Sequence, residues 1–91
     1  MEGIPPLAPD FVIELLSPAD WLPALEAKMA EYAANGVRLG WLIDPYERTV
    51  KVYRPGKDPE LLIGPERIAG DPELPGFVLE LDGIWQQSAP T

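Results

Sequence analysis

The chain has 91 residues and a net charge of −8, and it contains neither cysteine nor histidine. This composition excludes disulfides, thiolate or imidazole zinc sites and catalysis by a nucleophile paired with histidine. Any bound metal must therefore be a hard ion held by oxygen, such as Mg²⁺ or Mn²⁺. We expect no organic cofactor. The acidic charge also disfavours broad electrostatic attraction to nucleic acid.

The length and the 46% share of hydrophobic residues predict one small domain over residues 1–91, with a Pro-rich lead-in at 1–9 and a polar tail at 86–91. A domain of this size buries only a modest share of its apolar surface, so association with a partner is expected. No apolar run approaches the roughly 20 residues of a membrane span, and the N-terminus lacks a signal sequence. We therefore expect a cytoplasmic protein with no membrane partner.

The stretch Asp10 to Leu16 predicts a β-strand, and its almost continuous hydrophobicity favours burial on both faces. A period of two places Asp10 and Glu14 on one face, with their Cα atoms roughly 13 Å apart. That separation is too large for both to hold one ion unless their side chains bend together. A buried, isolated carboxylate costs several kcal/mol, so Glu14 needs a cation, which can be an arginine partner or a functional one. Asp10 is equally well explained as a turn residue.

A helix is predicted from about Ala19 to Asn35, or from Leu22 if Pro23 occupies its first turn. Ser17 or Asp20 is the candidate cap, and Gly36 the left-handed terminator. The expected packing stripe consists of Trp21, Leu22, Leu25, Met29 and Tyr32. Lys28 lies about 20° outside this stripe, beside Trp21 and Tyr32. On its own, Lys28 is best explained as a side chain that reaches solvent from the rim of an apolar face.

The remaining chain predicts further strands and a final helical turn that begins at Asp82. The expected strands are Arg38–Asp44, Thr49–Arg54, Glu60–Ile63, Arg67–Ala69 and Phe77–Leu81. A helical crossover makes the first two strands parallel, whereas the short connections make the later ones antiparallel. The predicted fold class is thus α+β or α/β, a mixed β-sheet with one main flanking helix. The singly placed glycines give no support for a nucleotide-binding loop.

Several of these segments together resemble the C-terminal half of the Uma-two family of restriction endonucleases, over residues 5 to 85. The residues that carry the resemblance are Pro9 to Pro18, Lys28 to Tyr32, Asn35 to Val37, Trp41 to Pro45, Val50 to Pro55, Leu74 to Phe77 and Ile84-Trp85. The resemblance implies the C-terminal part of a restriction-endonuclease-like PD-(D/E)XK fold. It also implies Mg²⁺-dependent hydrolysis of phosphodiesters, with DNA as the partner.

In such nucleases a strand glutamate and the next backbone carbonyl bind the ion, and a lysine positions or activates the attacking water. Glu14 matches that glutamate. Leu16 occupies the position where many of these nucleases keep the lysine, so the resemblance assigns that role to Lys28 in the following helix. Asp10 is a weaker second metal ligand. Relatives carry an upstream segment with another metal-binding aspartate, and the chain starts too late to include it.

Two functions are therefore expected. The first is a Mg²⁺-dependent DNA endonuclease that holds its ion weakly and is incomplete or inactive as this chain alone, unless a second copy or a complementing half supplies what is missing. The second is a catalytically degenerate relative that forms a homodimer and has no enzymatic role. Retention of Glu14 and Lys28 favours the first function, whereas the net charge and the missing aspartate favour the second.

Overall fold

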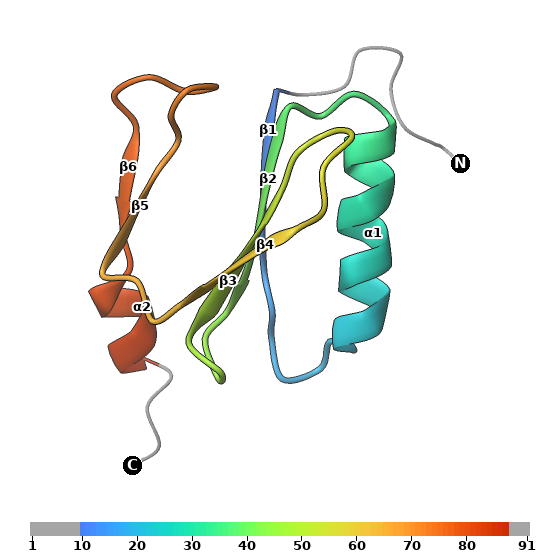
Figure 1. Cartoon of the computed structure of the whole chain (residues 1–91). Helices are drawn as coiled ribbons and strands as arrows, with labels where there is room; N and C mark the ends of the chain where they lie inside the picture. The colour runs from blue at the N-terminus through green and yellow to red at the C-terminus, as the bar shows by residue number, and fades with distance from the viewer. Residues whose placement is uncertain (1–9, 88–91) are drawn as a thin grey trace.

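A four-stranded mixed sheet lies between two layers of unequal size in the computed structural model, which describes residues 10–87 (Figure 1). The strands of this sheet are β1 (Phe11–Leu15), β2 (Leu39–Asp44), β3 (Thr49–Tyr53) and β4 (Glu60–Ile63), in that spatial order. β1 and β2 are parallel, and the other neighbours are antiparallel. The mixed sheet with one main helix, expected from the sequence, is confirmed.

Helix α1 (Leu22–Ala34) covers one face of the sheet, which we call the helix face. Met29 lies fully buried at the centre of the helix contact, together with Leu42 of β2 and Tyr53 of β3. Gly40 of β2 allows this close approach, because a Cβ there would lie 2.8 Å from the terminal methyl of Met29. The helix ends as expected, with Gly36 at a φ of 99°.

The opposite face, which we call the core face, is covered by a two-stranded hairpin and a short helix. The hairpin strands are β5 (Arg67–Ala69) and β6 (Val78–Glu80), and the helix is α2 (Asp82–Gln87). The main core lies here, with alternate residues of β2 and β3 packed against Ile68, Leu81 and Trp85. The sequence predicted β5 and β6 as strands, but not that they form a separate sheet.

Two details of the N-terminal region differ from the sequence predictions. Neither Ser17 nor Asp20 caps α1; the N-cap is Trp21, which has no side-chain capping bond, because Ser17 and Asp20 bond to each other in the preceding turn. Trp21 also lies outside the packing stripe, with 72% of its surface exposed. The helical periodicity does not extend to it, since its backbone is extended.

β1 is an edge strand, which corrects the expectation that it is buried on both faces. Its pairing with β2 leaves its other side unpaired by any strand within residues 10–87. Ile13 and Leu15 are 40% and 53% exposed on the core face, although their neighbours Phe11 and Leu16 are more enclosed. The hydrophobic run of β1 therefore belongs to a partly exposed edge strand. Its composition alone would fit a buried strand equally well.

Candidate active site

Glu14 projects from β1 onto the helix face, since it pairs in register with Leu42, whose side chain contacts α1. α1 returns over this face and places Lys28 so that its Nζ lies 3.2 Å from Oε2 of Glu14. The Lys28 side chain is 48% exposed and the Glu14 side chain is 25% exposed. The structure thus brings together the glutamate and the lysine that the sequence singled out, at an accessible position beside the edge of the sheet.

The charge of Lys28 is stabilised by its neighbours. The hydrogen bond and the charge of the Glu14 carboxylate raise the pKa of the Lys28 ammonium above its usual value, and partial burial only weakly opposes this. The Nζ atom also lies 5.9 Å from the ring centroid of Tyr32, at the outer limit of a cation–π contact. Lys28 is therefore a stable cation while it is paired, suited to stabilise negative charge rather than to accept a proton.

Asp10 is exposed and stands at the start of β1, where its backbone carbonyl accepts a bond from the amide of Leu39 at 3.1 Å. No hydrogen bond or ion pair among the described residues joins its carboxylate to Glu14 or Lys28. Three residues of extended chain lie between the two acids, so the pairing of β1 fixes them far apart. The structure therefore does not bring Asp10 into contact with the Glu14–Lys28 pair.

Asp20 is an acidic residue near this pair that the sequence suggested only as a helix cap. Its carboxylate accepts bonds from the amide and the hydroxyl of Ser17 at 2.8 and 3.0 Å. These bonds, the amide first, lower the pKa of Asp20, and the charge of Lys28 adds a smaller effect in the same direction. The Ser-x-x-Asp spacing was the available signal for this turn, which sets the point where α1 begins.

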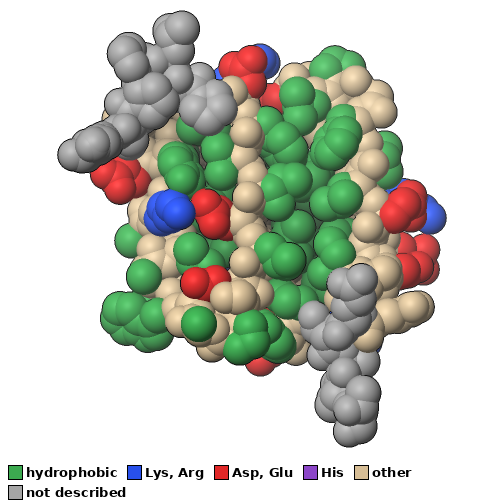
Figure 2. Space-filling view, turned by 180° about the vertical axis from the view of Figure 1, so that it is seen from behind, with side chains coloured by type: hydrophobic (Ala, Val, Ile, Leu, Met, Phe, Trp, Pro, Cys, Tyr) green, Lys and Arg blue, Asp and Glu red, His purple; other side chains and the backbone are tan. Residues whose placement is uncertain are grey.

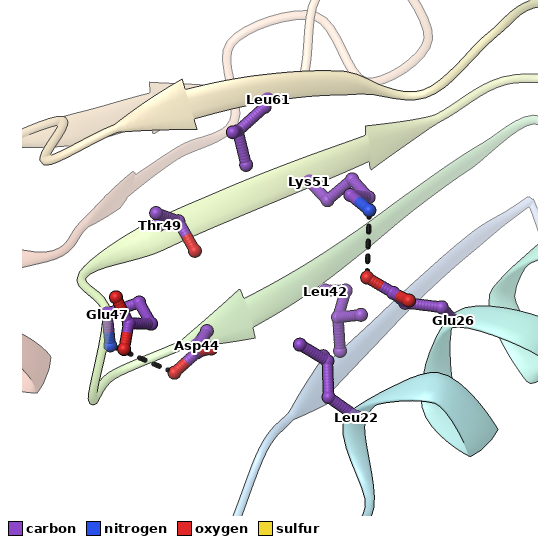
Figure 3. A pocket seen from close by; sticks show the side chains of 8 residues that line it. All are labelled: Leu22, Glu26, Leu42, Asp44, Glu47, Thr49, Lys51 and Leu61. Carbon is purple, nitrogen blue, oxygen red and sulfur yellow. Dashed lines mark hydrogen bonds and ion pairs between the residues drawn. The ribbon is translucent and has the colours of Figure 1, made fainter.

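A cavity of about 310 Å³ lies farther along the helix face, between the start of α1 and the β2–β3 hairpin (Figure 3). Two of its three acidic side chains, those of Glu26 and Asp44, already have structural partners. Glu26 forms an ion pair with Lys51 at 2.8 Å, and Asp44 accepts the backbone amides of Tyr46 and Glu47. Within residues 10–87 no three side chains of the metal-ligating types cluster together. Glu14 does not line this cavity, so it is separate from the Glu14–Lys28 pair.

The oxygen donors near Glu14 suit a hard divalent cation only partly. Glu14 supplies one carboxylate. The carbonyl of Leu15 points to the unpaired side of β1, because the bonds of Asp10 and Leu16 to β2 show that even-numbered residues face that strand. Mg²⁺ is typically held by one or two carboxylates plus waters and substrate phosphates, so this set lies at the lower end of what such an ion needs.

Comparison with known proteins gives a consistent relationship. The structure is similar to the crystal structure of "a putative nuclease belonging to DUF820" from Anabaena variabilis, with a TM-score of 0.76 and 30% sequence identity. The similarity covers 91% of this chain and 47% of that one, so the chain spans about half the length of the solved protein. No curated protein matches it at a significant level. No helix within residues 10–87 has the length and apolar character needed to cross a membrane.

The family relationship rests on most of the chain. A family model named Uma2, described as "Putative restriction endonuclease", matches residues 2–82, a range that contains the β1 strand, α1 and the Glu14–Lys28 pair. The sequence resemblance is thereby confirmed, as is the nuclease-like fold. The chain belongs to the Uma2 family of nuclease-like proteins.

Proposed function

We propose that the Glu14–Lys28 pair belongs to a Mg²⁺- or Mn²⁺-dependent site for hydrolysis of DNA phosphodiesters. The observation that carries this proposal is the 3.2 Å ion pair, which joins a strand carboxylate to a helix lysine at the accessible edge of the sheet. Membership of the family and the similarity to a nuclease support DNA as the substrate. The proposal concerns this site, and other parts of a complete nuclease would have to complement it.

The residues have distinct roles in this proposal. The Glu14 carboxylate and the Leu15 carbonyl would hold the ion, whereas Asp10 lies too far along β1 to share it. When bound, the ion supplies positive charge to the phosphate and lowers the pKa of a coordinated water. The Lys28 ammonium, whose pKa is raised beside Glu14, would stabilise the negative charge that develops on the phosphate during hydrolysis.

Because the chain is acidic, the proposed site needs the metal to bind DNA as well as to hydrolyse it. A net charge of −8 repels DNA, and one carboxylate holds Mg²⁺ weakly. Ion and phosphate therefore bind together better than either binds alone, since each supplies ligands or charge that the other lacks. We expect cleavage to require millimolar rather than micromolar metal.

A second candidate function is a homodimeric module without catalysis. The observation that favours it is the edge of β1 that no strand of the described part of the chain covers, with the exposed apolar residues Ile13 and Leu15. In this case Glu14 and Lys28 form a surface ion pair with no further role. The two candidates differ in whether the pair is needed for cleavage.

Cleavage of supercoiled plasmid in increasing Mg²⁺ or Mn²⁺ tests the proposal. Glu14→Gln and Lys28→Met should each lower the rate by about 100-fold or more, because each removes charge that acts in the transition state. Glu26→Gln and Lys51→Met are matched controls, since they break an ion pair on the same face at 2.8 Å and should cleave like the wild type. Equal rates in all four variants, or no cleavage by the wild type, would contradict the catalytic proposal and favour the non-catalytic module.

A further inference from the structure

The side of β1 that pairs with no strand within residues 10–87, which we call the open edge, presents a defined set of backbone groups. Asp10 accepts from the amide of Leu39, and Leu16 donates to the carbonyl of Ile43. Because consecutive residues of a strand point their backbone groups to opposite sides, the even-numbered residues bond to β2. The amides and carbonyls of Phe11, Ile13 and Leu15 therefore face outward at the open edge.

The open edge has few of the features that usually prevent strands from associating. β1 carries no proline or lysine, and one of its faces is apolar. Exposed hydrophobic side chains continue from β1 onto the hairpin: Ile13, Leu15, Phe77 and Val78 are 39–53% exposed. Figure 2 shows a strip of backbone down the molecule with a broad hydrophobic area along one side. Surfaces of this kind are typical of contacts with another polypeptide.

We propose that a second copy of this chain occupies the open edge, with the two β1 strands antiparallel about Ile13, so that the Glu14 carboxylates of both copies bind one divalent cation. This inference rests on the proposed function and modifies the same site: the Leu15 carbonyl now accepts a bond from the Phe11 amide of the second copy, and the second Glu14 carboxylate takes its place as a ligand. The outward backbone groups decide the alignment, because only odd-numbered residues can exchange hydrogen bonds. Centring on Ile13 pairs Phe11 with Leu15 and gives about six such bonds, the most that the strand allows.

This alignment brings the two glutamates close on one face. Val12 of each copy lies opposite Glu14 of the other in a pair without hydrogen bonds, with Cα atoms about 4.5 Å apart. The two Glu14 residues are then diagonal neighbours about 7–8 Å apart, within reach of long side chains. The twofold axis runs perpendicular to the sheet, so both α1 helices flank the same face. One ion thus gains two carboxylates, and the two Lys28 side chains offset the added negative charge.

A second copy fits the open edge better than an unrelated segment because β1 is complementary to itself. In the Ile13-centred alignment apolar residues face apolar residues on the core face, and Glu14 faces Val12 rather than another acid. The exposed Ile13 side chains of the two copies meet at the twofold axis, and the apolar surface reaching Phe77 is extended across it.

Cross-linking tests the alignment directly, because the chain has no cysteine of its own. Val12→Cys and Glu14→Cys place thiols at the directly opposed positions, at a Cα separation that suits a disulfide. A mixture of the two variants, oxidised with Mn²⁺ absent, should give mainly the mixed disulfide, at least about 10-fold above either variant alone. Lys57→Cys, in the loop between β3 and β4, is the control. A yield no greater than that of the control would overturn the dimer, and efficient cross-linking of either variant alone would overturn the Ile13-centred alignment.

Binding of Mn²⁺ tests the shared ion without any need for cleavage. Calorimetric titration of the wild type should give one ion per two chains, and sedimentation should show that Mn²⁺ favours the dimer. Glu14→Gln should abolish binding. Ile13→Pro removes an outward amide without touching the bonds to β2, so it should give a folded monomer whose Mn²⁺ affinity is at least about 10-fold lower. Glu26→Gln should bind like the wild type.

The outcomes separate this inference from the proposed function. One ion per chain, bound by a monomer through Glu14, would overturn the shared ion and leave the proposed function intact. Unchanged Mn²⁺ affinity in a monomeric Ile13→Pro variant would do the same. No Mn²⁺ binding by monomer or dimer would overturn the shared ion, and the plasmid cleavage assay would then decide the proposed function separately.

Discussion

The two faces of the four-stranded sheet are built from alternate residues of the same strands, yet they differ in chemistry. The core face carries Trp41, Ile43, Val50 and Val52, and the β5–β6 hairpin and α2 cover it except at β1. The helix face has only a small buried cluster around Met29, and charged residues surround it. Stability should therefore depend mostly on the core face, which leaves the helix face free to hold charges near the open edge.

Trp41 is the largest side chain of the core face, and its loss should have the largest effect. It is 1% exposed and contacts Phe11 and Phe77 at ring centroid distances of 4.8 and 6.0 Å. Trp41→Ala should lower the free energy of unfolding by about 3–5 kcal/mol, measured by urea denaturation. The exposed Trp21 gives the control, since Trp21→Ala should change stability by less than about 0.5 kcal/mol. Similar losses of stability in both variants would contradict the larger contribution of the core face.

An ion pair on the core face should have an intermediate effect that depends on pH. Arg54, just after β3, donates from Nε to Glu73 at 2.9 Å and ties the loop between β5 and β6 to the sheet. The Arg54 side chain lowers the pKa of Glu73 below its usual 4.5, with partial burial opposing it. The pair therefore contributes full stability above about pH 4.5 and loses it as the pH falls through the lower, folded-state pKa.

Arg54→Met should lower the free energy of unfolding by about 1–3 kcal/mol at pH 7. The loss relative to the wild type should shrink as the pH falls below 4.5, because protonated Glu73 no longer gains from the arginine. Urea denaturation at a series of pH values measures both effects, and Arg67→Met, which breaks an exposed pair with Glu80, serves as the comparison. A difference that stays constant down to pH 2 would contradict the pairing.

The smallest effect on stability is expected for the Glu14–Lys28 pair. Both side chains are partly exposed, and such pairs typically contribute less than about 1 kcal/mol. Lys28→Met should therefore leave the urea midpoint nearly unchanged, whereas its effect on cleavage should be large. A loss of several kcal/mol would show that the pair maintains the fold, and a loss of activity could then no longer be assigned to chemistry.

Much of the fold was predictable because the local signals were strong. The alternation of Val50 and Val52, the Asp44-Pro45 turn and Gly36 after the helix each have one favoured local structure. The helical spacing also predicted that Lys28 lies at the rim of the packing face, beside Tyr32. Its contact with Glu14 could not follow from spacing alone, because that contact depends on how α1 crosses the sheet.

The errors arose where tertiary context overrides a local pattern. The apolar residues of β1 are the same whether the strand is enclosed or at an edge, so Ile13 and Leu15 gave no sign of their exposure. Ser17 and Asp20 are both good caps, but they satisfy each other in a turn and leave the helix N-terminus to Trp21. The relation between Glu14 and the open edge likewise requires the strand order, which the sequence did not specify.

The different surroundings of the three tryptophans make them independent optical reporters. Trp41 and Trp85 are enclosed in the core, whereas Trp21 is exposed where the chain enters α1. A soluble quencher should therefore reach Trp21 first, and the emission that remains should come from the two buried rings. In a Trp21→Phe variant, the fluorescence comes from the two core tryptophans. In the wild type, the quenchable part of the emission comes from Trp21 and reports the turn between Glu14 and Lys28.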